Sequence, residues 1–170
     1  MTAMTDAMVV YESVLGRTRS LAEAVADVLR TTASSEVECL PLRSASMAAL
    51  EHTGLLVVGV PTRVPHPEPD VIDLRSPWPV SDTVCAWLDA VPPGFGRAVA
   101  VFDTRPDLRS VGAADVVAAR LRDEGYELVA PPKAFVVDGA VGPLPPEEWL
   151  RARTWAASRL PMSRYFTLPS

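Results

Sequence analysis

The sequence has few of the residues on which disulfide, metal and nucleic-acid chemistry depend. Its 170 residues include two cysteines, two histidines and one lysine, and the formal net charge is −5. Cys39 and Cys85 each stand in an apolar run and form no Cys-x-x-Cys pair, which disfavours a disulfide framework or a structural zinc site. An acidic chain without clustered Lys or Arg lacks the basic face that nucleic-acid binding requires. We therefore expect no nucleic-acid partner.

Long apolar stretches are missing as well. No window approaches the roughly 18 uninterrupted apolar residues of a membrane-spanning helix. The first eight residues, MTAMTDAM, have neither the basic start nor the apolar centre of a signal peptide. A content of 48% hydrophobic and 22% charged residues is ordinary for a globular protein. We expect a cytoplasmic protein without a membrane partner, with one domain over residues 1–170 that ends in a tail at 161–170.

Strand and helix patterns alternate along the chain. Short apolar runs predict buried strands at 8–11, 37–40, 54–60, 98–102 and within 126–138, where Pro131 and Pro132 split the strand. Helical spacing and capping residues predict helices at 18–30, 81–91, 113–124 and 145–160. Six prolines between 61 and 79 predict an irregular loop over 65–80. Strands that alternate with helices favour an α/β three-layer sandwich, a parallel sheet with helices on both faces.

Ligands of such sheets bind beyond the carboxyl ends of the strands, and the first of these loops carries suitable residues. Ser13, Gly16 and Thr18 stand directly before or in the first turn of a helix, where N–H groups and hydroxyls can bind an anion. Arg17 could add a positive charge. The alternative is that Ser13 and Thr18 only cap the helix.

Two other nucleotide-binding loops are excluded. The sequence has no Gly-x-x-x-x-Gly-Lys-Ser/Thr motif, and its one lysine, Lys133, is remote from the first loop. No Gly-x-Gly-x-x-Gly follows the first strand, and Gly94-Phe95-Gly96 is expected to form a turn.

At this point the sequence resembles a family. VVYESVLGRTRSLAEAVADVL resembles the first βα unit of flavodoxins, whose loop reads Ser/Thr-x-Thr-Gly-Asn-Thr. LLVVGVPTRVP, GRAVAVFDTR and AFVVDGAVGPLPPEEWLRARTWAASRL resemble the later strands and the closing helix, and Pro61-Thr62-Arg63 also resembles the Pro-Thr-Arg-Phe-Gly segment of flavodoxin-like quinone reductases. The resemblance implies a five-stranded parallel sheet with the strand order 2-1-3-4-5 and a site for FMN.

The resemblance also assigns residues to the two ends of the cofactor. The phosphate would be held by the first loop, with backbone donors and hydroxyls from Ser13, Val14, Leu15, Gly16, Arg17 and Thr18. The isoalloxazine ring would be framed by the loops after the third and fourth strands, at Pro61, Thr62, Arg63, Val64, Asp103, Thr104 and Arg105. Such proteins act in electron transfer or as small flavin-dependent oxidoreductases, so the further partner would be a redox protein or a small-molecule acceptor.

The ring-binding loops depart from the family pattern. Val64 stands where a Trp or Phe normally stacks, Pro65 replaces a glycine, and no Trp or Tyr occurs between residues 103 and 112. Trp78 is a possible substitute for the missing aromatic residues. These departures favour the alternative function, a degenerate flavodoxin-like domain that binds no flavin and serves as an interaction or regulatory module.

No other group of residues predicts a metal site or a catalytic site. His66 has Glu68 and Asp70 nearby, but a solvated loop is favoured over a metal site because a second anchoring ligand is lacking. His52 is expected in a surface turn, and no side chain is a convincing nucleophile or proton donor. The acids near the ring site, Asp103 among them, are expected to face solvent.

Overall fold

The computed structural model describes residues 5–33, 36–63, 79–108, 111–137 and 144–160. Its elements follow in the order β1 (Thr5–Tyr11), α1 (Arg17–Ala33), β2 (Val37–Pro41), the short 3₁₀ helix η1 (Leu42–Ser44), α2 (Met47–Glu51), β3 (Thr53–Pro61), α3 (Asp82–Ala90), β4 (Ala98–Arg105), α4 (Ala113–Asp123), β5 (Glu127–Leu128), β6 (Lys133–Val136) and α5 (Pro146–Arg159). The predictions for Val64, Pro65, His66 and Trp78, for most of the loop over 65–80, and for the tail at 161–170 lie outside the described residues.

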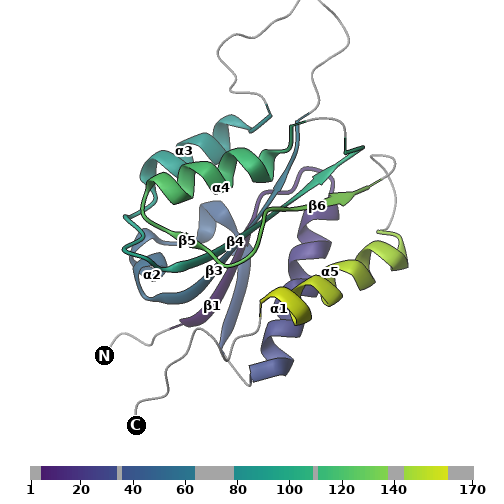
Figure 1. Cartoon of the computed structure of the whole chain (residues 1–170), viewed down its shortest axis with the longest axis horizontal. Helices are drawn as coiled ribbons and strands as arrows, with labels where there is room; N and C mark the ends of the chain where they lie inside the picture. Colours follow the sequence, from purple (N-terminus) through teal and green to yellow (C-terminus); the bar gives the residue numbers. More distant parts are fainter. Residues whose placement is uncertain (1–4, 34–35, 64–78, 109–110, 138–143, 161–170) are drawn as a thin grey trace, which may run out of the picture.

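The strands form one parallel sheet in the order β2-β1-β3-β4, and both β5 and β6 pair with β4 at the edge (Figure 1). The predicted order 2-1-3-4-5 is therefore confirmed, with the fifth position shared by two short strands. Glu127 and Leu128 lie beside the start of β4, and Lys133–Val136 lies beside its end. Pro131 and Pro132 separate the two segments, because proline has no N–H to donate to the sheet.

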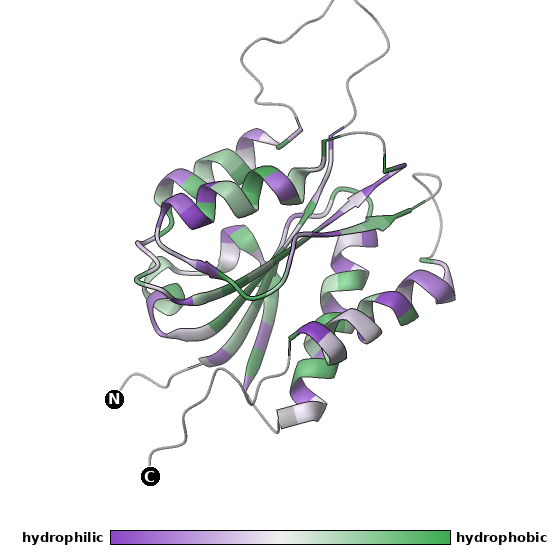
Figure 2. Cartoon of the chain, viewed as in Figure 1, coloured by the Kyte–Doolittle hydropathy of each residue, from purple (hydrophilic) through white to green (hydrophobic). Residues whose placement is uncertain are grey.

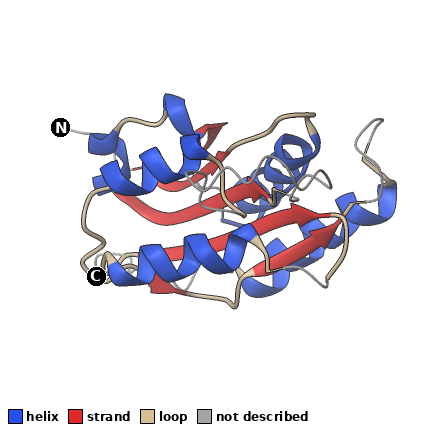
Figure 3. Ribbon diagram, turned by 90° about the horizontal axis from the view of Figure 1, so that it is seen from above, coloured by secondary structure: helices blue, strands red, loops and turns tan. Residues whose placement is uncertain are grey.

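Helices cover both faces of the sheet, as predicted. Figure 3 shows the sheet between its two layers of helices, and Figure 2 shows apolar residues concentrated along the strands. One core lies between the sheet and α1 with α5, and the other lies between the sheet and α2, α3 and α4. Because β1, β3 and β4 are central and buried on both faces, their side chains contribute to both cores.

Three aromatic rings fix the end of β4 against its neighbours. Phe102, Phe135 and Trp155 pack edge to face, with ring centroids 5.7 to 6.1 Å apart. Gly59 faces the Phe102 ring, and a Cβ at this position would overlap that ring. The cluster holds β3, β4, β6 and α5 together close to the carboxyl edge of the sheet.

Several elements differ from the sequence prediction. β1 begins at Thr5 instead of residue 8, and α1 ends at Ala33 instead of residue 30. β4 continues three residues beyond the predicted end at 102, to Arg105, and this extension brings Asp103 and Arg105 into the sheet. The five-residue helix α2 was not predicted, since it is too short to show helical spacing; Ser46 caps it by accepting a hydrogen bond from the Ala49 N–H.

Candidate functional site

The loop between β1 and α1 turns sharply at the carboxyl edge of the sheet. Gly16 has a φ of +90°, a left-handed conformation that favours glycine, and directly precedes the first residue of α1. The Gly16 N–H donates to Ser13 Oγ over 3.0 Å, which closes a small turn before the helix. Ser13 therefore stabilises the turn ahead of the helix, and among the described residues its hydroxyl accepts from no N–H of α1 itself.

The same loop presents backbone donors without an internal acceptor. Among the described residues, no hydrogen bond engages the N–H groups of Val14, Leu15 or Thr18, and the first turn of α1 holds no acidic side chain. Val14 and Leu15 are 79% and 62% exposed. The positive end of the α1 dipole thus meets solvent at this loop, which is the arrangement that binds anions.

Thr18 connects this loop to the end of β4. Its hydroxyl lies 3.0 Å from that of Thr104, and both side chains are buried. The structure therefore brings together two residues that sequence reasoning assigned to opposite ends of one ligand. The Thr18 side chain faces the sheet, so its contribution to an anion at the loop would come from its N–H.

The loops after β3 and β4 meet at the start of α4. Gly112, the N-cap residue of this helix, has no side chain that could cap it. The Ala113 N–H instead donates to Thr62 Oγ1 at 2.9 Å, and the Ala114 N–H donates to Asp103 Oδ2 at 2.9 Å. The Thr62 N–H donates in turn to the Thr104 carbonyl at 2.8 Å. Side chains of β4 and of the segment after β3 thus cap α4.

Asp103 is fully buried, so the expectation that it faces solvent is wrong. Arg105 donates to both of its carboxylate oxygens, at 2.9 and 2.7 Å, and this hydrogen bonding raises the pKa of the arginine further above neutral. Asp103 and Arg105 are neighbours on one face of a strand, where alternate residues point the same way. A Cβ at Gly112 would overlap both groups, which explains the glycine there.

The remaining predicted ring residues lie beside this cluster. Pro61 ends β3 next to Thr104, and Arg63 is exposed with its N–H bonded to the Pro79 carbonyl at 2.8 Å. Sequence reasoning missed two exposed apolar residues between β4 and α4, Leu108 and Val111. The sequence could have indicated them, because an apolar residue in a loop beyond the carboxyl end of a strand cannot reach the core and is therefore a candidate ligand contact.

Sequence reasoning also missed Glu12, the residue that follows β1. Ser81 donates to its carboxylate, at 2.8 and 2.7 Å from the two oxygens, and also accepts from the Val84 N–H as the N-cap of α3. Glu12 thereby ties the first loop to α3 across the carboxyl edge of the sheet. The two residues are far apart in sequence, and no local pattern links them.

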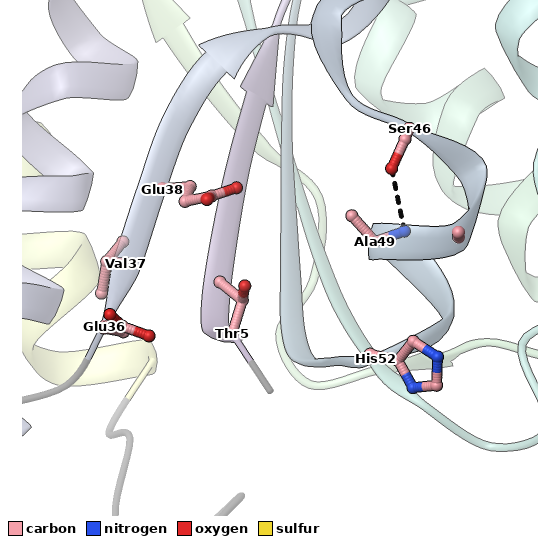
Figure 4. A pocket seen from close by; sticks show the side chains of 8 residues that line it. Thr5, Glu36, Val37, Glu38, Ser46, Ala49 and His52 are labelled. Carbon is pink, nitrogen blue, oxygen red and sulfur yellow. Dashed lines mark hydrogen bonds between the residues drawn. The ribbon is translucent and has the colours of Figure 1, made fainter. Parts of the chain in front are cut away.

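The other potential chemical groups lie away from this edge or are unreactive. Figure 4 shows a hollow at the opposite end of the sheet, lined by side chains from β1 and β2, from Glu36 and from the α2 region, with exposed His52 at its border. Burial raises the pKa of Cys39 to about 11, which keeps this thiol protonated at neutral pH. Within the described residues, no group of His, Cys, Asp and Glu could hold a metal ion. No helix in those ranges is both long and apolar enough to cross a membrane.

Solved structures share this architecture, although no protein-family model matches the sequence and no curated protein is similar to it at a significant level. A flavodoxin from the domain Archaea is 16% identical, with 95% of this chain and 99% of that chain covered and a TM-score of 0.72. Oxidised flavodoxin 2 from Bacillus cereus is 18% identical, with 95% and 100% covered and a TM-score of 0.71. The rubredoxin:oxygen oxidoreductase of Desulfovibrio gigas is 14% identical over 97% of this chain but only 38% of its own, with a TM-score of 0.71. The fold of this chain is flavodoxin-like.

Proposed function

We propose that this protein binds FMN at the carboxyl edge of its sheet and transfers electrons to or from a redox partner. The observation that carries the proposal is the open loop at the start of α1, with left-handed Gly16 and N–H groups that no described residue engages. In a flavodoxin-like fold, this is where the phosphate would bind. The flavin, when bound, supplies the electron-transfer chemistry, and the protein positions it.

The first loop fits the phosphate end of FMN. Val14, Leu15 and Thr18 would donate their N–H groups, and no acidic side chain in the first turn of α1 repels the anion. Arg17 stands at the first position of the helix and would contribute charge. The Ser13 hydroxyl already accepts from the Gly16 N–H, so its main role would be to hold the shape of the loop.

The ring end would rest on a prearranged frame. The side chains of Thr62 and Asp103 accept from the first N–H groups of α4, and the Thr104 hydroxyl lies against that of Thr18 in α1. These side chains would therefore fix the two ring loops in place instead of contacting the ring. Leu108 and Val111, both exposed, would offer the ring apolar surface. This frame would orient the ring without an aromatic partner from the described residues of these loops.

The test is a titration with FMN, followed by quenching of flavin fluorescence, on matched glycine variants. Gly16→Ala and Gly96→Ala each place a side chain at a positive φ with open space around it, so we expect a similar loss of stability, about 1–3 kcal/mol. Gly96 lies in the turn before β4, at the other end of the strand, so only Gly16→Ala should weaken FMN binding. Arg17→Glu should weaken it sharply as well.

The proposal fails if the wild-type protein shows no saturable FMN binding up to high micromolar concentration. It also fails if Gly96→Ala and Gly16→Ala weaken binding equally, because the loop would then have no specific role. Oxidation of NAD(P)H by an FMN-loaded sample would distinguish a reductase from an electron carrier.

A second candidate is a flavin-free interaction module with the same fold. It is favoured by the ring site, where the polar side chains form internal bonds and apolar Leu15, Leu108 and Val111 face solvent. Colourless protein that does not take up FMN, together with unchanged stability in its presence, would support this candidate.

A further inference from the structure

The turn before β4 exposes an aromatic side chain at the amino edge of the sheet, opposite the proposed flavin site. Phe95 is 85% exposed, the largest fraction among the large hydrophobic residues that the structure describes. Its φ of +49° is left-handed, a conformation that is strained for Phe and that glycine adopts freely. Because an exposed ring adds little to the core, neither packing nor backbone geometry accounts for a Phe at this position.

Hydrogen bonds hold this turn in its strained shape. The N–H groups of Gly94 and Gly96 donate to the carbonyls of the two residues that follow α4, each over 2.7 Å. The Arg97 guanidinium donates to the Gly94 carbonyl over 2.9 Å, and Gly94 lies so close to Tyr126 that a Cβ would overlap its backbone. Strain that the surrounding structure enforces is typical of functional positions. A backbone that is already fixed also loses little conformational freedom when it binds a partner.

Acidic side chains border the turn on three elements. Glu124 directly follows α4, and Glu127 begins β5 and donates its N–H to the Arg97 carbonyl over 2.8 Å. Glu51 ends α2 and follows Leu50, whose carbonyl accepts from the Arg97 side chain over 3.2 Å. All three glutamates are exposed, and in the part of the chain that the structure describes no ion pair neutralises them.

The surface around Phe95 stays negative when the nearby arginines are counted. The Arg97 guanidinium donates to main-chain carbonyls through all three of its nitrogens, so it is directed toward the protein. Arg122 and Asp123, both exposed at the end of α4, contribute opposite charges. Three exposed carboxylates therefore face solvent against one guanidinium that is engaged internally.

From these features we propose that the turn around Phe95 is a docking site for a protein partner whose surface has an apolar pocket bordered by Lys or Arg side chains. The Phe95 ring fills that pocket, and Glu51, Glu124 and Glu127 face the cations around it. An aromatic anchor in a desolvated pocket, with charged groups at the rim, is the usual arrangement of a binding hot spot.

The charge of the border selects among possible occupants. Exposed carboxylates attract a cationic surface and repel an anionic membrane. They also repel a second copy of this chain, whose formal net charge is −5. Phe95 precedes β4, whereas the proposed flavin site lies beyond its other end, so the docking site does not depend on whether flavin binds.

The first measurement separates a binding role of Phe95 from a structural role. Phe95→Gly should keep or raise the urea midpoint, because glycine adopts a positive φ without strain and the exposed ring contributes little to the core. A clearly lower midpoint would show that the ring supports the fold and would overturn the proposal.

The second experiment places the photo-reactive residue benzoylphenylalanine at position 95 of the full chain, in the cells that produce the protein naturally. The matched control carries it at position 149, where Trp149 is an aromatic residue of α5 that is 43% exposed. We expect a cross-linked protein from position 95 only. That protein, identified by mass spectrometry, is then purified and titrated with the full-length wild type and its variants.

In this titration Phe95→Gly should weaken the affinity about thirtyfold or more, as the loss of an aromatic hot spot does. Glu124→Lys should weaken it about fivefold, mainly through slower association and more strongly at low salt. Glu147→Lys is the matched control, since Glu147 is an exposed acid in the first turn of α5, and it should leave the affinity unchanged.

The proposal is overturned if position 95 yields no cross-linked protein, or yields only a second copy of this chain. Equal capture from positions 95 and 149 would overturn it as well. So would a captured protein that Phe95→Gly binds as tightly as the wild type does, or one for which Glu147→Lys weakens binding as much as Glu124→Lys.

Discussion

Helices α1 and α4 both begin at the carboxyl edge of the sheet, but their first turns are satisfied in different ways. At α4 the sheet provides a carboxylate, because Asp103 accepts from the Ala114 N–H while Thr62 accepts from the Ala113 N–H. At α1 the Gly16 N–H, just ahead of the helix, donates to the Ser13 side chain, and the first turn has no acid. Protein side chains therefore cap the start of α4, whereas the N–H groups of Val14, Leu15 and Thr18 at the start of α1 bond to none of the described residues. We call the first a filled helix start and the second an open one.

This difference indicates a structural role for the start of α4 and a binding role for the start of α1. A helix N-terminus attracts an anion wherever its N–H groups are accessible. Asp103 supplies that anion at α4, and Arg105 balances its charge, so α4 needs no ligand. The start of α1 has the same attraction with nothing described that satisfies it. The following substitutions test the comparison, from the largest expected effect on stability to the smallest.

Asp103→Asn should have the largest effect. The substitution removes the buried carboxylate charge that pairs with the guanidinium of Arg105, which should lower the free energy of unfolding by about 3 kcal/mol. Asp115→Asn is the matched control, because Asp115 contacts the same arginine at 3.5 Å but is 55% exposed and should contribute less than about 0.5 kcal/mol. Urea unfolding measures both, and equal losses would contradict the view of α4 as a filled helix start.

Gly112→Ala should destabilise the protein by about 2 kcal/mol, within the usual range for overpacking. The backbone at Gly112 has an ordinary negative φ, so the cost would come only from overlap with Arg105 and Asp103. The double variant with Arg105→Ala should recover part of the loss that Gly112→Ala causes. Thermal unfolding of the four forms in a double-mutant cycle gives this coupling, and strict additivity would exclude the overlap as the cause.

Thr62→Val should cost about 1 kcal/mol, because it removes the acceptor of the Ala113 N–H while preserving shape. Thr83→Val is a suitable control, since Thr83 is a partly exposed residue of α3 whose hydroxyl accepts from exposed Arg43. Denaturant midpoints should fall for the first variant and hardly change for the second.

Ser13→Asp should convert the open helix start into a filled one. A carboxylate near the N-terminus of α1 should raise the free energy of unfolding by about 0.5 kcal/mol at low salt. The same charge should weaken FMN binding about tenfold or more by repelling the phosphate. Ser13→Asn, which caps without charge, should do neither, and improved FMN binding in Ser13→Asp would place the phosphate elsewhere.

The sequence predicted the layers because the central strands are buried on both faces and therefore form continuous apolar runs. The strand order came from the resemblance to flavodoxins and not from the pattern. The sequence also predicted the break at Pro131 and Pro132, since proline acts locally. The first loop could be identified for the same reason, because Ser13 and Gly16 determine its turn within four residues.

The contacts between distant segments could not be predicted in this way. The burial of Asp103 depends on where β4 ends, and a polar Asp-Thr-Arg sequence reads as loop unless the alternation of Val99 and Val101 is continued through it. The cap from Thr62 to Ala113 joins residues 51 positions apart, and the bond from Ser81 to Glu12 joins residues 69 positions apart. Only the assembled sheet edge brings these groups together.

The interrupted outer strand has a consequence for association between copies. An exposed sheet edge offers unpaired N–H and C=O groups on which another chain can add a strand, a common start of aggregation. Here that edge consists of a two-residue and a four-residue strand with two adjacent prolines between them. An incoming strand would find neither a continuous ladder nor donors at the prolines, so this border of the sheet resists strand addition while the apolar end of β4 stays covered.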